Sequence, residues 1–340
     1  MSTRFAFVGF RHPHIRDMLT RCQQHPEIDV VACCEQDSVT REELAREGQI
    51  VITHDDYEVL LEQIDCDVIA VGDVYGKRGE LIVRGLQCGR HVISDKPVCI
   101  SLTELDRIEQ LASEQQRIVS GMLDMRDSPV SLGMRELIRG DQIGAIRAVS
   151  FDGQHPLMFG TRPDWYFAAG MHGGTLNDIA IHAMDFIPWA TGQPLETLLA
   201  ARSWNANLPQ VPHFHDGGQV LLTLQNGAGV LGDVSYLLPD SFGYEMPLYW
   251  RFTFWGADGV IEAGVNTPTI RLYRNGEQTA REIPLPAGRP GGYLDAFLAE
   301  IHGATSDLHL SSHEVLAATR RTLRIQQAAE DKSSYLPLAD

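Results

Sequence analysis

The sequence predicts an α/β protein of two domains, in which a doubly wound parallel sheet is followed by an α+β domain with a mostly antiparallel, open sheet. Its 340 residues exceed what one ordinary hydrophobic core holds. The first 120 residues alternate short apolar runs with amphipathic stretches, the pattern of parallel strands covered by helices on both faces. Later strands follow one another directly, separated by turn residues. We expect the first domain over 1–124 and the second over 125–340.

The first domain is predicted to contain six buried strands and five helices. Thr40 and Glu43 have capping-box spacing, so the second helix is expected to begin at Thr40. Ligands of such sheets bind beyond the carboxyl ends of the strands, which makes the residues after each strand the candidates for binding. The predicted strands are 5–8, 30–34, 50–52, 68–71, 91–94 and 118–121, and the other helices are 15–24, 57–63, 80–88 and 102–115.

The second domain changes character after a first helix, a strand and another helix. Turn sequences such as Asn226-Gly227 and Asn275-Gly276 separate its strands, which is typical of an antiparallel sheet. An open sheet of this size usually needs a cover, so we expect a homodimer or homotetramer through its outer face. We expect the closing helices to pack against the first domain or the sheet. The predicted helices are 130–139, 178–189, 294–301 and 312–329, and the strands are 146–152, 220–224, 230–236, 250–255, 260–263 and 269–273.

Charge and composition exclude several classes of partner. The net charge of −17 repels nucleic-acid phosphates and anionic membrane surfaces. The N-terminus shows no signal-peptide apolar region, and no apolar run is long enough to span a bilayer, so a cytoplasmic protein is expected. The six cysteines show no C-x-x-C spacing and are expected to be buried, reduced thiols. No metal site is predicted.

The turn after the first strand reads Gly9-Phe10-Arg11-His12-Pro13-His14. A Rossmann dinucleotide fingerprint has glycine at the first, third and sixth of these positions, and here only Gly9 is glycine. A plain strand-to-helix turn is the alternative interpretation of this motif. Arg11 could contact a phosphate with its guanidinium group, or it could block the approach of a pyrophosphate.

Glu35 follows the second strand, 26 residues after Gly9. A carboxylate at this position accepts hydrogen bonds from the adenine ribose hydroxyls and repels a 2′-phosphate, which favours NAD over NADP. The alternative is a solvated acid in an acidic loop.

Two later motifs carry a family resemblance. Asp95-Lys96-Pro97 follows the fifth predicted strand, and a glycine pair at 173–174 precedes Asp178 and His182. On these residues the chain resembles the glucose-fructose oxidoreductase/inositol dehydrogenase (Gfo/Idh/MocA) family, which has a glutamate-lysine-proline motif and a glycine pair followed by an aspartate four residues before a histidine. The resemblance extends over roughly residues 4–330. The residues 72–78 depart from it, because they lack the proline-asparagine pair that follows the fourth strand in the family.

The resemblance implies an NAD(P)-dependent dehydrogenase of a sugar, polyol or cyclitol. It implies that His182 is the general base, that Asp178 orients it and that Lys96 hydrogen-bonds the reacting oxygen. The i, i+4 spacing of Asp178 and His182 agrees, because it puts both on one face of a helix, with Asp185 near it. A surface ion pair on that helix is the alternative.

The remaining candidates are assigned by position in the chain. Arg126, Trp165 and His172 are candidates for substrate contact, with packing roles as the alternative. His213 and His215 lack a visible third metal ligand, so a polar loop is favoured there. The predicted cofactor contacts are Gly9, Phe10, Arg11, His12, Glu35, Gly72, Asp73, Asp95 and Lys96.

Two other functions stay open on this scaffold. Some members of the family use NAD transiently, so that a glycosidic group can be eliminated. Others are nucleotide-binding regulators, and the two missing glycines motivate that alternative.

Overall fold

The computed structural model describes residues 2–338, and its chain divides into two compact units. Unit 1 comprises the residues up to Met122, together with Gly170–Gly173 and Tyr293–Leu316. Unit 2 comprises Leu123–Ala169, Gly174–Gly292 and the chain from Ala317 onward. The chain therefore passes from one unit to the other several times.

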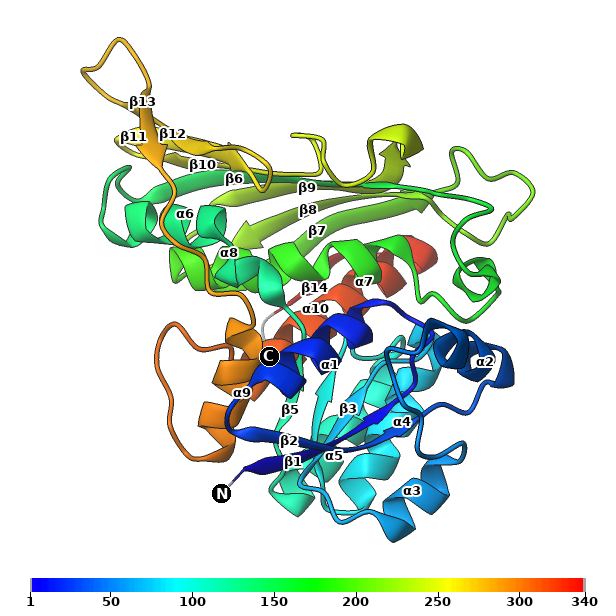
Figure 1. Ribbon diagram of the computed structural model, residues 1–340. Coiled ribbons are helices and arrows are strands. Elements are labelled where there is room, and N and C mark those ends of the chain that lie inside the picture. The colour runs from blue at the N-terminus through cyan, green and yellow to red at the C-terminus, as the bar shows by residue number, and fades with distance from the viewer. Residues whose placement is uncertain (1, 339–340) are drawn as a thin grey trace. The chain divides into compact units, whose positions relative to one another are not determined.

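Unit 1 is built on a five-stranded parallel sheet with the order β2-β1-β3-β4-β5, and helices flank it (Figure 1). Its strands are short and apolar, and every residue of β3 is buried, as expected for a sheet covered on both faces. The strands are β1 (Thr3–Val8), β2 (Ile28–Cys34), β3 (Val68–Val71), β4 (His91–Ser94) and β5 (Val119–Gly121). Its helices are α1 (His14–Gln24), α2 (Ser38–Glu47), α3 (Tyr57–Gln63), α4 (Tyr75–Gln87), α5 (Leu102–Gln115) and α9 (Gly292–Ile301).

The strand order changes direction at β1. The chain places β2 on one side of β1 and β3 on the other, so the loops after β1 and β3 leave the same edge in different directions. Such a switch point is where doubly wound sheets bind their ligands. The loops that begin at Gly9 and Gly72 therefore occupy the binding edge of unit 1.

The predicted strand 50–52 is wrong. The N–H groups of Thr53 and His54 both point to the carbonyl of Cys33, and next to the sheet the segment forms an isolated bridge between Cys34 and His54 in place of a strand. Val51 is 78% exposed, so the apolar run does not join the core.

Two helix starts also differ from the prediction. Helix α2 begins at Ser38, two residues earlier than predicted, because the carboxylate of Asp37 accepts the Thr40 N–H at 2.9 Å and caps the helix. Helix α4 begins at Tyr75 rather than at 80, although it contains Gly76 and Gly79. A Cβ atom on Gly79 would lie 2.6 Å from the Glu104 side chain of α5, so this glycine permits close helix packing.

Unit 2 contains a nine-stranded sheet in which β6 and β9 form one parallel pair among antiparallel ones. Helices α6, α7 and α8 lie along one face (Figure 1). The strands are β6 (Ile146–Pro156), β7 (Leu195–Trp204), β8 (Gly217–Leu224), β9 (Gly229–Leu238), β10 (Trp250–Gly256), β11 (Gly259–Gly264), β12 (Thr269–Arg274), β13 (Arg281–Pro284) and β14 (Ser334–Pro337). The helices are α6 (Pro129–Arg139), α7 (Thr175–Ile179), α8 (Ile181–Thr191) and α10 (Ser312–Asp331), which begins in unit 1.

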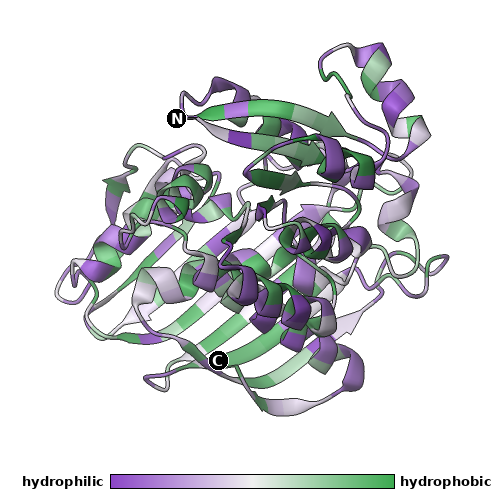
Figure 2. Cartoon of the chain, turned by 90° about the horizontal axis from the view of Figure 1, so that it is seen from below, coloured by the Kyte–Doolittle hydropathy of each residue, from purple (hydrophilic) through white to green (hydrophobic). Residues whose placement is uncertain are grey.

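The two faces of this sheet differ in exposure. Figure 2 shows green, hydrophobic residues along the strands, alternating with paler ones. Leu221, Leu231, Trp255 and Tyr273, which share the face opposite to the helices, are 40–59% exposed. The predicted fold class is confirmed, and the homodimer or homotetramer through this face stays a prediction.

The helix predicted over 178–189 is divided into α7 and α8, with Ala180 between them at φ −65° and ψ −14°. Ala180 remains in the right-handed helical region, and its carbonyl accepts the N–H groups of both Ala183 and Met184. The helical rise is therefore nearly continuous from Asp178 to His182, although the hydrogen-bonding pattern changes between them.

All six cysteines are free thiols, of which five are buried and Cys88 is exposed, so the expectation of burial is wrong for Cys88. Over residues 2–338 no helix has the length and apolar character that a bilayer crossing requires.

The core of unit 2 depends on Phe186, which is fully buried against Phe252, with ring centroids 4.8 Å apart. We expect Phe186→Ala to lower the free energy of unfolding by about 3–5 kcal/mol, because it removes a buried ring and leaves a cavity. Phe242, which is 58% exposed, provides the matched control, and Phe242→Ala should change stability by less than about 0.5 kcal/mol. Urea denaturation measures both, and equal effects would contradict this account of the core.

Candidate cofactor and acid–base sites

The loops after β1 and β3 press directly against each other in unit 1. Gly9 has φ +77°, and a Cβ atom on it would lie 2.4 Å from the Cβ of Asp73. The backbone N–H of Asp73 donates to the Gly9 carbonyl at 3.1 Å. Only glycine fits at position 9, for reasons of both backbone conformation and space.

Arg11, in place of the second fingerprint glycine, binds the same loop. Its Nε donates to Asp73 Oδ1 at 2.5 Å, and the Val74 N–H donates to that oxygen at 2.6 Å. Asp73 itself has φ +52°, a conformation unusual for a residue with a side chain, and these contacts stabilise it. Arg11 thus connects the two loops of the switch point while its side chain remains 18% exposed.

Glu35 lies at the end of β2, next to the loop that follows β1. It is 1% exposed, and its Oε2 accepts the Phe10 N–H at 2.5 Å while its Oε1 accepts the Asp37 N–H at 2.8 Å. Burial raises the pKa of this carboxyl group, although the two backbone donors act in the opposite direction. Glu35 was predicted to belong to the binding edge, and these two hydrogen bonds define the orientation of its carboxylate.

A charged network surrounds Asp95, at the end of β4. Arg78 of α4 donates to Asp95 Oδ2 at 2.7 Å, and both side chains are fully buried. The imidazole of His12 hydrogen-bonds the same oxygen through Nδ1, and His14 Nδ1 lies 3.2 Å from Asp95 Oδ1. The loop after β1 is thereby joined to the end of β4.

The protonation states follow from burial and charge. Burial lowers the pKa of His12 to about 4, and the neighbouring Asp95 only partly opposes that shift, so this imidazole is neutral at pH 7. Burial alone would raise the pKa of Asp95, but the Arg78 guanidinium, together with the hydrogen bond to His12, outweighs it and holds that pKa well below its usual value. Tyr75 completes the network, because its hydroxyl lies 3.2 Å from His12 Nε2.

Lys96 comes directly after Asp95, where the predicted motif places it. It is 4% exposed, and the Lys96–Pro97 peptide bond is cis. The Pro97 carbonyl accepts Arg78 Nη1 at 3.0 Å, so the segment that carries Lys96 is fixed by the same arginine as Asp95.

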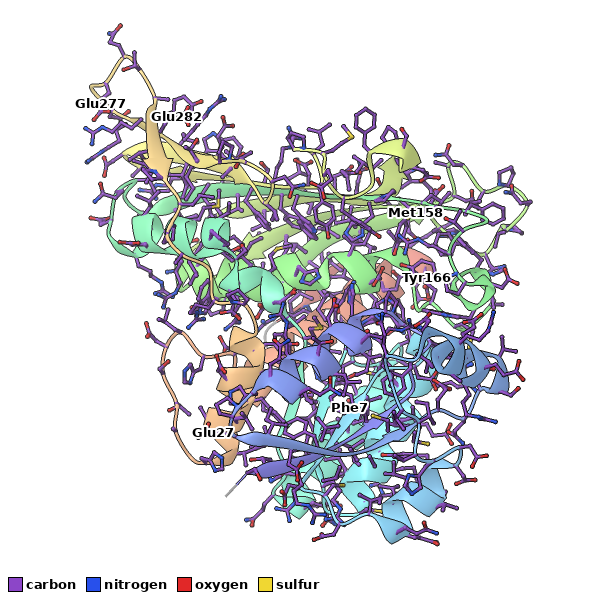
Figure 3. All side chains as sticks on the ribbon, viewed as in Figure 1. Phe7, Glu27, Met158, Tyr166, Glu277 and Glu282 are labelled. Carbon is purple, nitrogen blue, oxygen red and sulfur yellow. The ribbon has the colours of Figure 1, made fainter. Side chains whose placement is uncertain are left out.

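In unit 2, two tyrosines surround the carboxylate of Asp178. Tyr166 donates to Asp178 Oδ2 at 3.0 Å, Tyr236 donates to the same oxygen, and the two hydroxyls are 2.8 Å apart. Tyr166 lies on the segment between β6 and α7 (Figure 3), whereas Tyr236 comes from β9. Asp178 is thus oriented by two neutral donors.

Tyr166 keeps its proton. Burial, followed by the nearby Asp178 charge, raises the pKa of Tyr166 well above its usual value, so it donates at physiological pH. The guanidinium of Arg162 lies over the Tyr166 ring at 4.5 Å and donates to Tyr244 Oη at 2.8 Å.

His182 lies in the first turn of α8, at its N-terminal end. The imidazole is buried, and its ring meets that of Trp250 edge-on at 5.9 Å. The arrangement fixes the plane of the ring, which a group that exchanges protons with a substrate requires.

The three candidates for substrate contact each have defined contacts in the structure. Arg126 binds Asp185 through two hydrogen bonds, one of 3.0 Å from Nε, and its guanidinium lies 5.1 Å from the Trp189 ring. The Trp165 ring packs on Tyr166, and that of His172 lies 5.6 Å from Tyr75. Their roles in substrate binding stay predictions.

The two histidines of the 213–215 segment have separate partners. His213 Nε2 lies 2.9 Å from the Phe167 carbonyl, and His215 Nδ1 lies 2.7 Å from Ser203 Oγ. These contacts agree with the polar loop that the sequence favours.

Among the residues of these sites that were not predicted are Arg78, Tyr75 and Tyr236. Arg78 and Tyr75 lie in the stretch that departs from the family pattern, and their partners are 17 and 63 residues away along the chain. For Tyr236 a signal was present, because a tyrosine on the inner face of a strand needs a partner for its hydroxyl group.

Comparison with known proteins gives matches in both parts of the chain. Residues 3–122 match the model of an oxidoreductase family with an NAD-binding Rossmann fold, and residues 132–262 match the GFO/IDH/MocA C-terminal domain. The dTDP-3,4-didehydro-2,6-dideoxy-alpha-D-glucose 3-reductase of Saccharopolyspora spinosa is 26% identical over 80% of this chain and 79% of that protein. Several other curated relatives match over only about half of their own length.

Solved structures show the same fold along the whole chain. An oxidoreductase from Agrobacterium radiobacter, in complex with NAD+, L-tartaric acid and magnesium, has a TM-score of 0.80 at 16% identity and covers 99% of both chains. The aldose-aldose oxidoreductase from Caulobacter crescentus, complexed with glycerol, has a TM-score of 0.79 at 17% identity and covers 98% of this chain and 99% of that one.

The buried Arg126–Asp185 pair gives a test of whether Arg126 stabilises the fold. We expect Arg126→Met to lower the free energy of unfolding by about 3–5 kcal/mol, because it leaves the Asp185 charge buried without this partner. Adding Asp185→Leu should recover most of that loss, since an apolar pair replaces a charged one. Denaturant unfolding of the two single variants and the double variant measures the coupling, and additive losses would contradict it.

Proposed function

Because the chain belongs to the GFO/IDH/MocA oxidoreductase family, we propose that it is an NAD-dependent dehydrogenase acting on a hydroxyl carbon of a sugar, polyol or cyclitol. The observation that carries the proposal is the binding edge of unit 1, where Gly9, Glu35 and Asp73 meet at the strand-order switch point. The match of residues 3–122 to an NAD-binding model supports the same assignment.

The residues at this edge fit a dinucleotide. Gly9 provides the tight turn after β1, and helix α1 begins at His14, so its N-terminus favours a negatively charged group. Arg11 supplies a guanidinium group suited to phosphate oxygens. The remaining lone pairs of Glu35 can accept hydrogen bonds from ribose hydroxyls, and its position disfavours a 2′-phosphate.

We assign the acid–base chemistry to three side chains. NAD, when bound, supplies the acceptor for the hydride that leaves the hydroxyl-bearing carbon. We assign removal of the hydroxyl proton to the imidazole of His182, and hydrogen bonding to the reacting oxygen to Lys96. Asp178, held by Tyr166 and Tyr236, is assigned to binding a neighbouring hydroxyl and orienting the base.

The substrate class rests on relatives whose names refer to sugars or cyclitols. Besides the reductase of Saccharopolyspora spinosa, they include a myo-inositol 2-dehydrogenase and a levoglucosan dehydrogenase. A polyhydroxylated ring also suits a site with several oriented oxygen donors and acceptors, such as the Asp178–Tyr166–Tyr236 group.

Turnover tests the proposal directly. The protein is mixed with NAD and a panel of sugars, polyols and cyclitols, and formation of NADH is followed by absorbance. With a substrate found, we expect His182→Ala to lower kcat by about a hundredfold to ten-thousandfold, because it removes the general base. NAD affinity should stay unchanged, and His302→Ala, at an exposed position, is the control.

The outcomes separate the alternatives. Unchanged activity in His182→Ala would contradict the assigned base. NAD binding without turnover across the panel would favour a nucleotide-binding regulator, and cleavage of a chromogenic glycoside without accumulation of NADH would favour NAD-assisted elimination. Absence of NAD binding and of turnover would overturn the proposal.

Cofactor preference tests the role of Glu35. We expect Glu35→Gln to reduce the preference for NAD over NADP by about tenfold or more, because it removes the charge that repels a 2′-phosphate. The amide oxygen retains an acceptor for the Phe10 N–H. Ratios of kcat/KM for the two cofactors measure the effect, with the exposed Glu27→Gln as control (Figure 3), and an unchanged ratio would contradict it.

A further inference from the structure

We propose that His12, His14 and Asp95 form a binding site for a zinc ion at the carboxyl edge of the parallel sheet in unit 1. This departs from the expectation of no metal site. Two of the ligands form a His-x-His pair, and the third lies 81 residues after His14 along the chain. Only the folding of the chain brings Asp95 close to the two histidines.

The three side chains converge with spacing suited to one ion. Their ligand atoms all lie within 4.8 Å of one another. His14 Nδ1 and Asp95 Oδ1 are 3.2 Å apart, and two ligands of a tetrahedral zinc ion, each at 2.0–2.1 Å from the metal, are separated by about 3.3 Å. His12 Nδ1 hydrogen-bonds the other oxygen of the same carboxylate, and binding of the ion would replace that hydrogen bond.

The donor set is typical of an open transition-metal site. Two imidazole nitrogens and one carboxylate oxygen give three protein ligands, which leaves a fourth tetrahedral position for water or an anionic oxygen. His12 and Asp95 are buried, whereas the His14 side chain is 41% exposed and gives the ion a route from solvent. A site of hard oxygen ligands would favour magnesium or calcium, and two imidazoles favour zinc.

A second layer of contacts orients these ligands. Arg78 donates to Asp95 Oδ2 and leaves Oδ1 directed at His14. Arg78 is itself fixed by the carbonyls of Gly72 and Pro97, at 2.6 and 3.0 Å. Tyr75 Oη hydrogen-bonds His12 Nε2, the ring nitrogen that would face away from the ion, as is usual for metal-bound imidazoles.

The same contacts would also serve a network without metal, and His14 distinguishes the two. A metal-free network of Arg78, Asp95 and His12 has no need of His14, whose ring lies partly in solvent. A zinc site needs His14 as its third ligand. Because the Arg78 charge already balances that of Asp95, an ion here would add net positive charge next to the N-terminus of α1, which suits a phosphate or carboxylate oxygen in the open position.

The experiment uses the full chain, freed of metal with a chelator and without NAD, so its result is independent of the proposed dehydrogenase activity. Zn²⁺ is titrated by calorimetry, and Co²⁺ replaces it for absorption spectroscopy, because tetrahedral Co²⁺ absorbs strongly in the visible range. We expect one ion per chain. His14→Ala should weaken its affinity at least tenfold and abolish the tetrahedral Co²⁺ spectrum, and circular dichroism should show that the variant is folded.

Two controls locate the ion. His302→Ala changes an exposed histidine of unit 1, and the double variant His213→Ala/His215→Ala removes the other His-x-His pair of the chain. Both should bind Zn²⁺ as the unaltered protein does. Failure of the unaltered protein to bind Zn²⁺, undiminished binding by folded His14→Ala, or loss of the ion from the His213/His215 variant would overturn the proposal.

Discussion

The binding edge of unit 1 depends on the buried ion pair between Arg78 and Asp95. Both side chains are fully excluded from solvent, so neither charge is tolerable without the other. The arginine also donates to backbone carbonyls at Gly72 and Pro97, which belong to the loops after β3 and β4. Asp95 in turn receives His12 from the loop after β1. One pair thus sets the relative positions of three strand ends.

Unit 2 orients its carboxylate by different means. Asp178 receives its hydrogen bonds from the hydroxyls of Tyr166 and Tyr236, which act as donors. Neutral donors fix the direction of the carboxylate without neutralising it. The charge of Asp178 therefore remains able to act on a neighbouring imidazole or a substrate hydroxyl, whereas that of Asp95 is balanced by Arg78. The contrast agrees with the acid–base role that we propose for Asp178.

The features that could be predicted from the sequence are those that depend on local periodicity or on a residue's position at the end of a strand. Continuous apolar runs located β1 to β5, and the residues after them, Glu35 and Asp95 among them, do lie at the carboxyl edge. The strand at 50–52 was predicted wrongly because three apolar residues satisfy a strand pattern whether or not a neighbouring strand pairs with them. The early start of α4 was missed because Gly79 lowers helix propensity, and its packing against Glu104 is visible only in three dimensions. Arg78 and Tyr236 were missed for a related reason: their partners are distant in the chain, and no spacing rule connects them.

The altered glycine motif is explained by the same contacts. In a typical fingerprint, glycines let the backbone itself approach a pyrophosphate. Here Gly9 is retained, since a Cβ atom would collide with Asp73, but the next two glycine positions carry Arg11 and His14. Arg11 binds Asp73, and His14 faces Asp95, so each adds a side-chain contact at a position that is glycine in the fingerprint. A loop built in this way presents charged and ligating groups to whatever it binds, and its affinity should depend on those side chains more than on the path of the backbone.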